Sequence, residues 1–181
     1  MNSPLILLVI PQNRFCGQQL FDLKEVLERE TGQCRILSKS GKEARGEDKS
    51  SLQPDGMLVD WNRYLQGRHK YDAVVVIGGK GSKTSIWDDP ILPQILTDHF
   101  RAGKILGAFG LSVVALGRAG LISQCEVSAL DDPAFLQELQ DAGAFPEGRN
   151  LIATDRIITS NDPEGGKSFG EALLRMLAGQ G

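Results

Sequence analysis

Short runs of apolar residues alternate along the chain with stretches in which apolar residues recur at the spacing of a helix. The runs are rich in Val and Ile, as buried strands are, and the spaced stretches are typical of amphipathic helices. We therefore predict strands at 5–10, 34–38, 72–79, 104–109, 126–130, 151–155 and 157–160, and helices at 17–32, 88–101, 112–119, 133–142 and 166–177. This alternation predicts an α/β fold, a three-layer sandwich in which a mostly parallel sheet carries helices on both faces.

Local signals indicate where some of these elements begin and end. Gly32 is expected to end the first helix, because glycine commonly follows the last helical residue. Asp88 or Asp89 is expected to cap the helix predicted at 88–101, with Pro90 in its first turn. We interpret the polar stretch 39–54 as an excursion, or a hairpin, at one edge of the sheet.

Composition narrows the class of protein. The chain has 181 residues, a formal charge of −3 and 41% hydrophobic residues, which suits one globular domain spanning 1–181. It has no excess of basic residues that would attract nucleic acid. The apolar run near the N-terminus is too short to span a bilayer and lacks the leader and cleavage site of a signal peptide. We therefore expect no membrane association.

The cysteines and histidines limit the possible chemistry. Cys16, Cys34 and Cys125 are widely spaced and odd in number, which favours reduced thiols in the cytoplasm over disulfides or a zinc cluster. We expect no metal and no cofactor. His69 and His99 are the two histidines, and neither follows a predicted strand. Both are interpreted as surface residues, although a Ser-His-Asp or Cys-His site would need an imidazole beside its nucleophile.

In a sheet of this kind, ligands bind beyond the carboxyl ends of the strands. The segments expected there are PQNRFCGQ, GGKGSKT, FGLS and NDPEGG. GGKGSKT is similar to a phosphate-binding loop, but when it is aligned on Lys83, Ile77 and Ser82 occupy the two required glycine positions. We expect instead that Gly78 and Gly79 turn the backbone and present N–H groups to the crevice.

Two further side chains at this edge have alternative interpretations. Cys16 lies where a helix begins, so backbone amides, with help from Arg14, would lower the pKa of its thiol; alternatively it is a small packing residue. Asp162 either caps the last helix or faces the crevice as an acid. Cys34 and Cys125 lie in or beside strands and are expected to be inert.

Several of these segments together resemble the ThiJ/PfpI family, a branch of the class I glutamine amidotransferase-like proteins. The third-strand motif of that family is matched by Asp72, Gly78, Gly79 and Gly81, and its elbow and following helix by Ala108, Phe109, Ala119, Gly120 and Leu121. The loop and helix after the last strand are also similar. The resemblance covers nearly the whole chain and implies a flavodoxin-like fold and, as in many family members, a homodimer.

The same resemblance indicates that the chemistry of the family is missing. Gly110 stands where the family carries its nucleophilic cysteine, and Leu111 follows it. Cys16 and Gln19 stand at the two acidic positions of the glutamate-bearing stretch. Glycine cannot attack a carbonyl group, and glutamine cannot exchange a proton with a thiol.

We therefore expect a protein that lacks the family's cysteine-dependent activity. It is expected to bind a small molecule or a partner in the crevice at the carboxyl ends of the strands, where the family has its active site. The crevice is expected to have the backbone groups of Gly78, Gly79 and Leu111 on one side and the side chains of Arg14, Gln19, Asn161 and Asp162 around it. The alternative is an enzyme or redox sensor that uses Cys16, with family-like hydrolase, glyoxalase or deglycase chemistry on small substrates.

Overall fold

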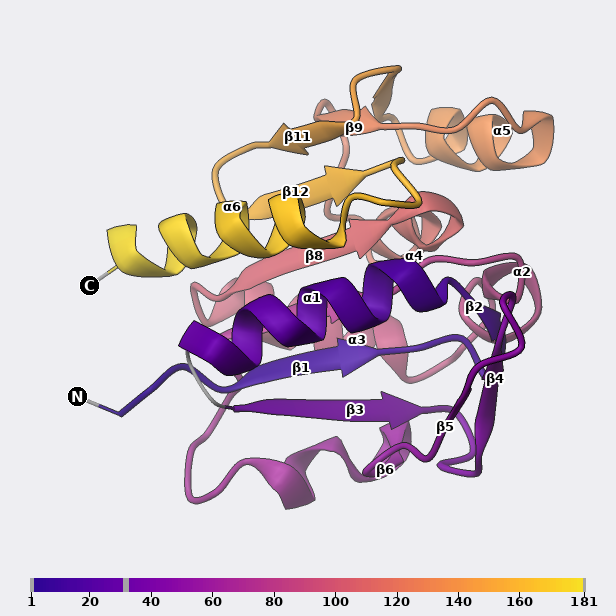
Figure 1. The fold of residues 1–181 in the computed structure, drawn as a ribbon. Helices are drawn as coiled ribbons and strands as arrows, with labels where there is room; N and C mark the ends of the chain where they lie inside the picture. The colour runs from indigo at the N-terminus through magenta and orange to yellow at the C-terminus, as the bar shows by residue number, and fades with distance from the viewer. Residues whose placement is uncertain (1, 31–32, 181) are drawn as a thin grey trace.

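A seven-stranded sheet forms the centre of the computed structural model, which describes residues 2–30 and 33–180 (Figure 1). Every neighbouring pair in it is parallel except β11 with β12. Across the sheet the strands are β11 (Leu151–Ala153), β12 (Ile157–Ser160), β8 (Ile105–Phe109), β7 (Ala73–Val76), β1 (Ile6–Val9), β3 (Cys34–Ser38) and β6 (Gly56–Met57). The mostly parallel sheet predicted from the sequence is thus confirmed.

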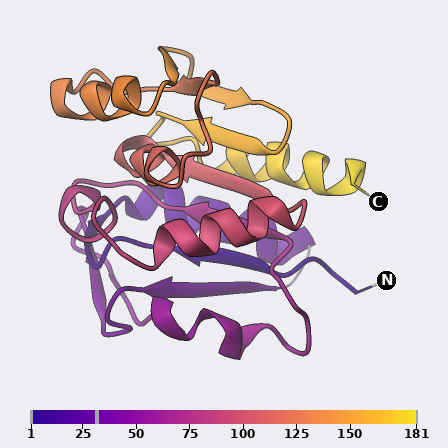
Figure 2. The same ribbon diagram turned by 180° about the vertical axis from the view of Figure 1, so that it is seen from behind.

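Helices cover both faces of this sheet. On one face α1 (Gly17–Glu30) packs against α6 (Gly166–Gly179), and on the other lie α3 (Leu92–Arg101) and the short α4 (Val114–Arg118) (Figures 1 and 2). The helix α5 (Pro133–Asp141) lies on the β11 side of the sheet, toward the carboxyl ends of the central strands. The fold is therefore the expected three-layer, flavodoxin-like sandwich. Among the described residues, no helix is both long enough and apolar enough to cross a membrane.

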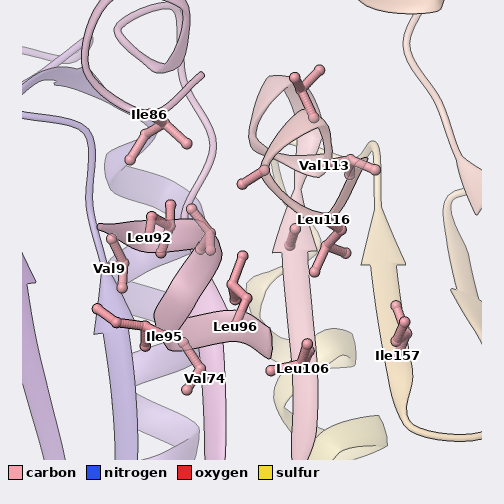
Figure 3. Close-up of a cluster of buried hydrophobic side chains, with 14 of the residues drawn as sticks. Val9, Val74, Ile86, Leu92, Ile95, Leu96, Leu106, Val113, Leu116 and Ile157 are labelled. Atoms are coloured by element: carbon pink, nitrogen blue, oxygen red, sulfur yellow. The ribbon is translucent and has the colours of Figure 1, made fainter. Parts of the chain in front are cut away.

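Two hydrophobic cores lie on the two faces of the sheet. Successive residues of a strand point to opposite faces, so Val74 belongs to one core and Val75 to the other. Figure 3 shows the first core, in which Val74 and Leu106 of the sheet lie against Ile95 and Leu96 of α3. Burial on both faces explains why these strands are apolar at every position.

The polar stretch 39–54 does form a hairpin, but it does not extend the central sheet. Its strands β4 (Ala44–Gly46) and β5 (Ser51–Leu52) are antiparallel, and β4 pairs with β2 (Asn13–Phe15), which follows β1. These three short strands form a separate sheet. The hairpin therefore stands over the carboxyl ends of the central strands, and β6 is the edge strand of the central sheet.

The prediction for the start of α3 was wrong by several residues. The helix begins at Leu92, and Pro93 rather than Pro90 lies in its first turn. Asp89 still holds this end, since its Oδ1 accepts hydrogen bonds from the backbone N–H groups of Ile91 and Leu92 at 2.8 and 2.9 Å. The carboxylate therefore bonds the first helical residue and the residue before it, although the N-cap position itself is Ile91. Gly32, the predicted end of α1, lies outside the described residues.

Other predicted elements are confirmed with adjustments. The predicted helix at 112–119 consists of a 3₁₀ turn, η2 (Gly110–Val113), followed by α4. The predicted strand at 126–130 is β9 (Glu126–Ser128), and it pairs with β10 (Phe145–Glu147), a strand without a sequence signal. Two short helical segments, η1 (Leu58–Tyr64) and α2 (Ser82–Ser85), complete the described elements.

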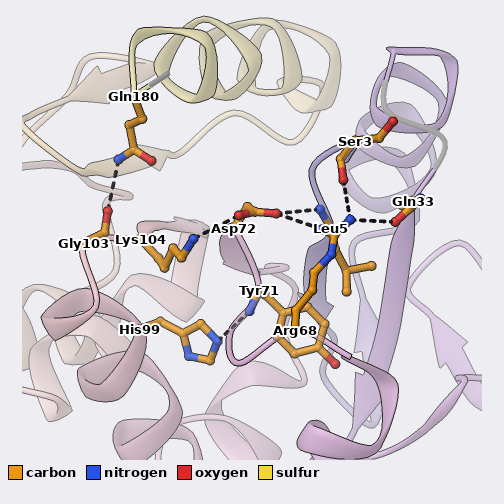
Figure 4. Close-up of polar contacts among 10 residues, drawn as sticks. All are labelled: Ser3, Leu5, Gln33, Arg68, Tyr71, Asp72, His99, Gly103, Lys104 and Gln180. Atoms are coloured by element: carbon orange, nitrogen blue, oxygen red, sulfur yellow. Dashed lines mark hydrogen bonds and ion pairs between the residues drawn. The ribbon is translucent and has the colours of Figure 1, made fainter. Parts of the chain in front are cut away.

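Ion pairs close the amino end of the sheet (Figure 4). The carboxylate of Asp72 accepts a hydrogen bond from the Leu5 N–H at 2.9 Å and pairs with Arg68 and Lys104, each at 3.0 Å. Burial alone would raise the pKa of Asp72, but the hydrogen bond from Leu5 and the two cations outweigh it and lower that pKa. Asp72 therefore ties the starts of β1, β7 and β8 together.

The expectation that His99 is a surface residue was wrong. Its side chain is fully buried, its Nε2 accepts a hydrogen bond from the Tyr71 N–H at 3.2 Å, and its Nδ1 lies 2.7 Å from the carbonyl oxygen of Ile95. These contacts match a neutral ring with the proton on Nδ1. Burial lowers the pKa of His99, which supports the neutral form. The sequence pattern did not show that His99 lies on the face of α3 that is turned toward the core. His69 is exposed, as predicted.

Candidate functional site

The carboxyl ends of the central strands open into a cavity of about 370 Å³. Six segments contribute to its wall: the start of α1, the β4–β5 turn, the loop after β7, the loop after β8, the loop between β9 and α5, and the loop after β12. The lining residues are Cys16, Gln19, Glu47, Gly79, Lys80, Gly110, Leu111, Leu130, Asp131, Asp132, Asn161 and Pro163. The cavity thus lies where the strand order predicted a binding crevice.

The corner between β8 and η2 is occupied by Gly110. Its φ is +51°, in the left-handed region that residues other than glycine rarely adopt, and the preceding residue, Phe109, still has an extended backbone. A Cβ atom at this position would meet only one atom within 4 Å, the Cδ1 of Leu130 at 3.5 Å. The corner therefore has room for a side chain but carries none.

Hydrogen bonds hold this corner in place. The Ser112 hydroxyl donates to the carbonyl oxygen of Ile77 at 2.6 Å, and its oxygen is 2.7 Å from that of Ser82. The Trp87 Nε1–H donates to the carbonyl oxygen of Leu111 at 2.8 Å. The loops after β7 and β8 are therefore fastened to each other, so the cavity wall is preformed.

The loop after β7 depends on two glycines with different roles. A Cβ atom at Gly79, whose φ is +127°, would lie 2.2 Å from the carbonyl oxygen of Arg14. The Gly78 N–H donates to the Oε1 of Gln19 at 3.2 Å, so it is not free for a ligand. Nothing in the described part of the chain accepts a hydrogen bond from the Gly79 N–H. Of these two glycines, Gly79 is the one that lines the cavity and whose N–H has no acceptor within the described residues.

The side chain of Gln19 connects two loops of the site through hydrogen bonds. Its side chain is only 4% exposed, and besides accepting from Gly78 it donates from Nε2 to the carbonyl oxygen of Asp162 at 3.1 Å. These bonds join α1 to the loops after β7 and β12. A neutral amide can donate and accept at once, whereas an ionised carboxylate only accepts, so the amide satisfies both partners without taking up a proton.

Of the two interpretations of Cys16, the one in which the pKa of its thiol is lowered is not supported. Burial raises its pKa most; the backbone N–H groups of Gln18 and Gln19 lower the pKa less, and the carboxylates of Glu47 and Asp48 raise it further. The half-buried thiol donates to the carbonyl oxygen of Pro163 at 3.6 Å. The amides at the helix start do act as the sequence suggested, but they are outweighed.

Arg14 does not support this thiol either. Arg14 is exposed and does not belong to the cavity wall, although its backbone lies against the glycine loop.

The other two cysteines, Cys34 and Cys125, are half-buried as well. Burial raises the pKa of Cys34 to about 12, which agrees with the inert role expected for it. The Cys125 thiol donates to the carbonyl oxygen of Ser123 at 3.7 Å.

The loop after β12 carries the last two predicted lining residues. Asn161 does line the cavity, and its Nδ2 donates to the carbonyl oxygen of Ala129 at 2.8 Å. Asp162 does not line it, and it does not cap α6 directly. Its Oδ1 accepts from the Glu164 N–H at 2.9 Å and so stabilises the turn that precedes the helix.

Four charged residues of the cavity wall were missed: Glu47, Lys80, Asp131 and Asp132. The aspartates follow a predicted strand, which is a signal that could have drawn attention to them. Glu47 lies in the polar stretch 39–54, and only the folded hairpin brings it to the cavity. Asp132 accepts a hydrogen bond from Lys83 at 2.9 Å, so the second lysine of GGKGSKT forms an ion pair.

Nowhere in the described ranges do three His, Cys, Asp or Glu side chains gather as a metal site would require.

Comparison with known proteins gives one consistent result. The DJ-1/PfpI family model matches residues 6–176. An uncharacterised protein of Methanocaldococcus jannaschii is 27% identical over 177 residues, which cover 98% of this chain and 84% of that protein.

Solved structures agree with this match. A ThiJ/PfpI domain protein from Brachyspira murdochii has a TM-score of 0.85 at 24% identity, with 99% of both chains covered. The DJ-1beta protein of Drosophila melanogaster has a TM-score of 0.80 at 19% identity, covering 97% of this chain and 91% of that one. At these identities the likeness establishes the fold alone.

Proposed function

The chain belongs to the DJ-1/PfpI family, and from this premise we propose that it binds a small molecule in the cavity around Gly110 without covalent chemistry. The observation that carries the proposal is a corner with no side chain, Gly110, at the wall of a cavity of about 370 Å³. A cavity of this size is within the range of small-molecule sites, which favours a small ligand over a protein partner.

The polar groups of the cavity suit reversible binding. The Gly79 N–H is unused within the described residues and offers a donor to a carbonyl or hydroxyl oxygen of a ligand. Leu111 and Leu130 supply apolar wall on the side of the corner. Because these loops are fastened to one another, little ordering is needed when a ligand binds.

Thiol chemistry at Cys16 is the competing function, and the electrostatics of the cavity oppose it. The thiolate is the reactive form, and both burial and the neighbouring carboxylates favour the protonated form of this thiol. The proton acceptor would also be missing, because both ends of the Gln19 amide are engaged and an amide does not take up a proton.

Turnover assays test the proposal. Purified protein and a Cys16→Ser variant would be compared for peptidase, glyoxalase and deglycase activity, with a catalytically active family member as the positive control. We expect no turnover by the wild-type protein above that of the variant. Turnover that Cys16→Ser abolishes would establish the competing function, and turnover that survives it would contradict both.

A further inference from the structure

Glu47 differs from the other carboxylates of the cavity in where it comes from. It lies in the turn between β4 and β5, and its backbone N–H donates to the carbonyl oxygen of Phe15 at 2.9 Å. Its side-chain Oε1 accepts a hydrogen bond from the backbone N–H of Lys80 at 2.6 Å. The small sheet thus holds a negative charge against the loop after β7, one residue from the available N–H of Gly79.

The remaining charges at the cavity are arranged differently. Asp132 is already engaged, because its Oδ1 accepts from the Phe135 N–H and its Oδ2 pairs with Lys83. Asp131 is exposed at the rim, and Lys80 is exposed with its ammonium in no ion pair within the described ranges. Glu47 is therefore the one of these carboxylates that is bonded directly to the glycine loop.

The charged groups that act most on the Cys16 thiol are carboxylates. Glu47 and Asp48 both raise the pKa of this thiol, and no cation is among its main influences. A negative potential that disfavours a thiolate disfavours any other anion at the same place. A positively charged group there gains the corresponding attraction.

We propose that Glu47 is the specificity-determining residue of the cavity, and that it selects ligands with a positively charged group, such as a primary amine, over anionic ligands. The inference rests on the proposed function, that the cavity binds a small molecule. A ligand carboxylate at the Gly79 loop would meet the Glu47 carboxylate. A ligand ammonium at the same place would pair with its second oxygen, which makes no hydrogen bond within the described residues.

Two probes of similar shape and opposite charge, butylammonium and butyrate, test this inference. Each would be titrated into ¹⁵N-labelled wild-type protein, Glu47→Gln and Glu43→Gln, following the amide signals of Gly79, Lys80 and Leu111. Glutamine at position 47 can still accept from Lys80, so the variant removes the charge and keeps the hydrogen bond. Glu43 is exposed, precedes β4 and is outside the cavity wall, so its variant is a matched control for net charge.

We expect wild-type protein to bind butylammonium about three to five times more tightly than butyrate, the effect of one partly exposed charge. Glu47→Gln should lose this preference and Glu43→Gln should keep it. The same preference in all three proteins, or none in the wild type, would overturn the inference while leaving the cavity as a binding site. Failure of both probes to shift these amides in any of the three proteins would contradict the inference and the proposed function together.

Discussion

The two ends of the central sheet are built from the same strands but differ in whether their polar groups have partners within the protein. At the amino end, the Asp72 carboxylate satisfies a backbone N–H and pairs with Arg68 and Lys104 (Figure 4). At the carboxyl end, the Gly79 N–H is unused within the described residues and Gly110 presents no side chain to a cavity. One end joins strands to one another, and the other leaves groups available for a ligand.

Alanine substitutions of one glycine at each end should give the largest difference. Gly79 and Gly103 both have positive φ, +127° and +77°, but a Cβ at Gly79 would lie 2.2 Å from a backbone oxygen, whereas one at Gly103 would meet nothing within 4 Å. Gly103→Ala should cost about 1 kcal/mol of unfolding free energy, from the left-handed backbone alone. Gly79→Ala should cost about 3 kcal/mol or more, because the backbone must also move.

Urea unfolding followed by circular dichroism measures both costs. Equal costs for the two variants would show that the glycine loop of the cavity is no more tightly constrained than an open turn.

Removing one aspartate from each end should give the next largest difference. Asp72→Ala leaves the Leu5 N–H without its acceptor and Arg68 and Lys104 without their partner, and should lower the unfolding free energy by about 2 kcal/mol. Asp131→Ala removes an exposed rim charge and should change it by less than about 0.5 kcal/mol. Denaturant midpoints at pH 7 measure both. A larger loss for Asp131→Ala would reverse the structural roles assigned to the two ends.

Between pH 7.5 and 5, the pH dependence of stability should come from one histidine at the amino end, His99. Burial lowers the pKa of His99 below its usual 6.5, so the unfolded chain takes up this proton first as the pH falls. The stability that the neutral ring provides is therefore complete above about pH 6.5 and is lost at lower pH, with a slope of at most about 1.4 kcal/mol per pH unit.

Unfolding measured from pH 7.5 to 5 in wild-type protein, His99→Gln and His69→Gln checks this slope. His99→Gln should lose it and His69→Gln should keep it. An NMR titration of the wild-type rings is a second measurement, and a His99 ring that titrates at or above pH 6.5 would contradict the burial argument.

Thiol reactivity should show the smallest effect. Cys16 should be alkylated more slowly at pH 7.5 than a free thiol in an unfolded peptide, since its pKa is raised, and Cys34 should be slower still, with a pKa of about 12. Mass spectrometry of each cysteine peptide after brief labelling gives the rates. Labelling of Cys16 faster than the free peptide would restore the thiol-dependent alternative.

The sequence was sufficient for the parts of the fold that follow from local patterns. Runs such as residues 73–76 have one apolar residue after another because both faces of the strand are buried, so they identify the sheet directly. The positions of Gly79 and Gly110 at the cavity also follow, since strand order fixes where carboxyl ends meet.

The electrostatics of the site could not be predicted in this way. The pKa of Cys16 depends on its burial and on Glu47 and Asp48, which are distant in sequence and reach it only through the β4–β5 hairpin. His99 likewise looked like a surface residue because a helical pattern does not show which polar position faces inward. Contacts between distant segments determine these properties.

The most direct test of the proposed function is to find where small uncharged molecules bind to the protein and whether they are chemically altered. A library of small amides and aldehydes would be screened against ¹⁵N-labelled protein, with amide shifts, the intact mass of the protein and the chemical fate of each compound recorded on the same samples. We predict reversible shifts concentrated at Gly79, Gly110 and Leu111, with protein and compound unchanged. Shifts confined to other surfaces, a covalent adduct at Cys16 or enzymatic consumption of a compound would contradict non-covalent binding in the cavity around Gly110.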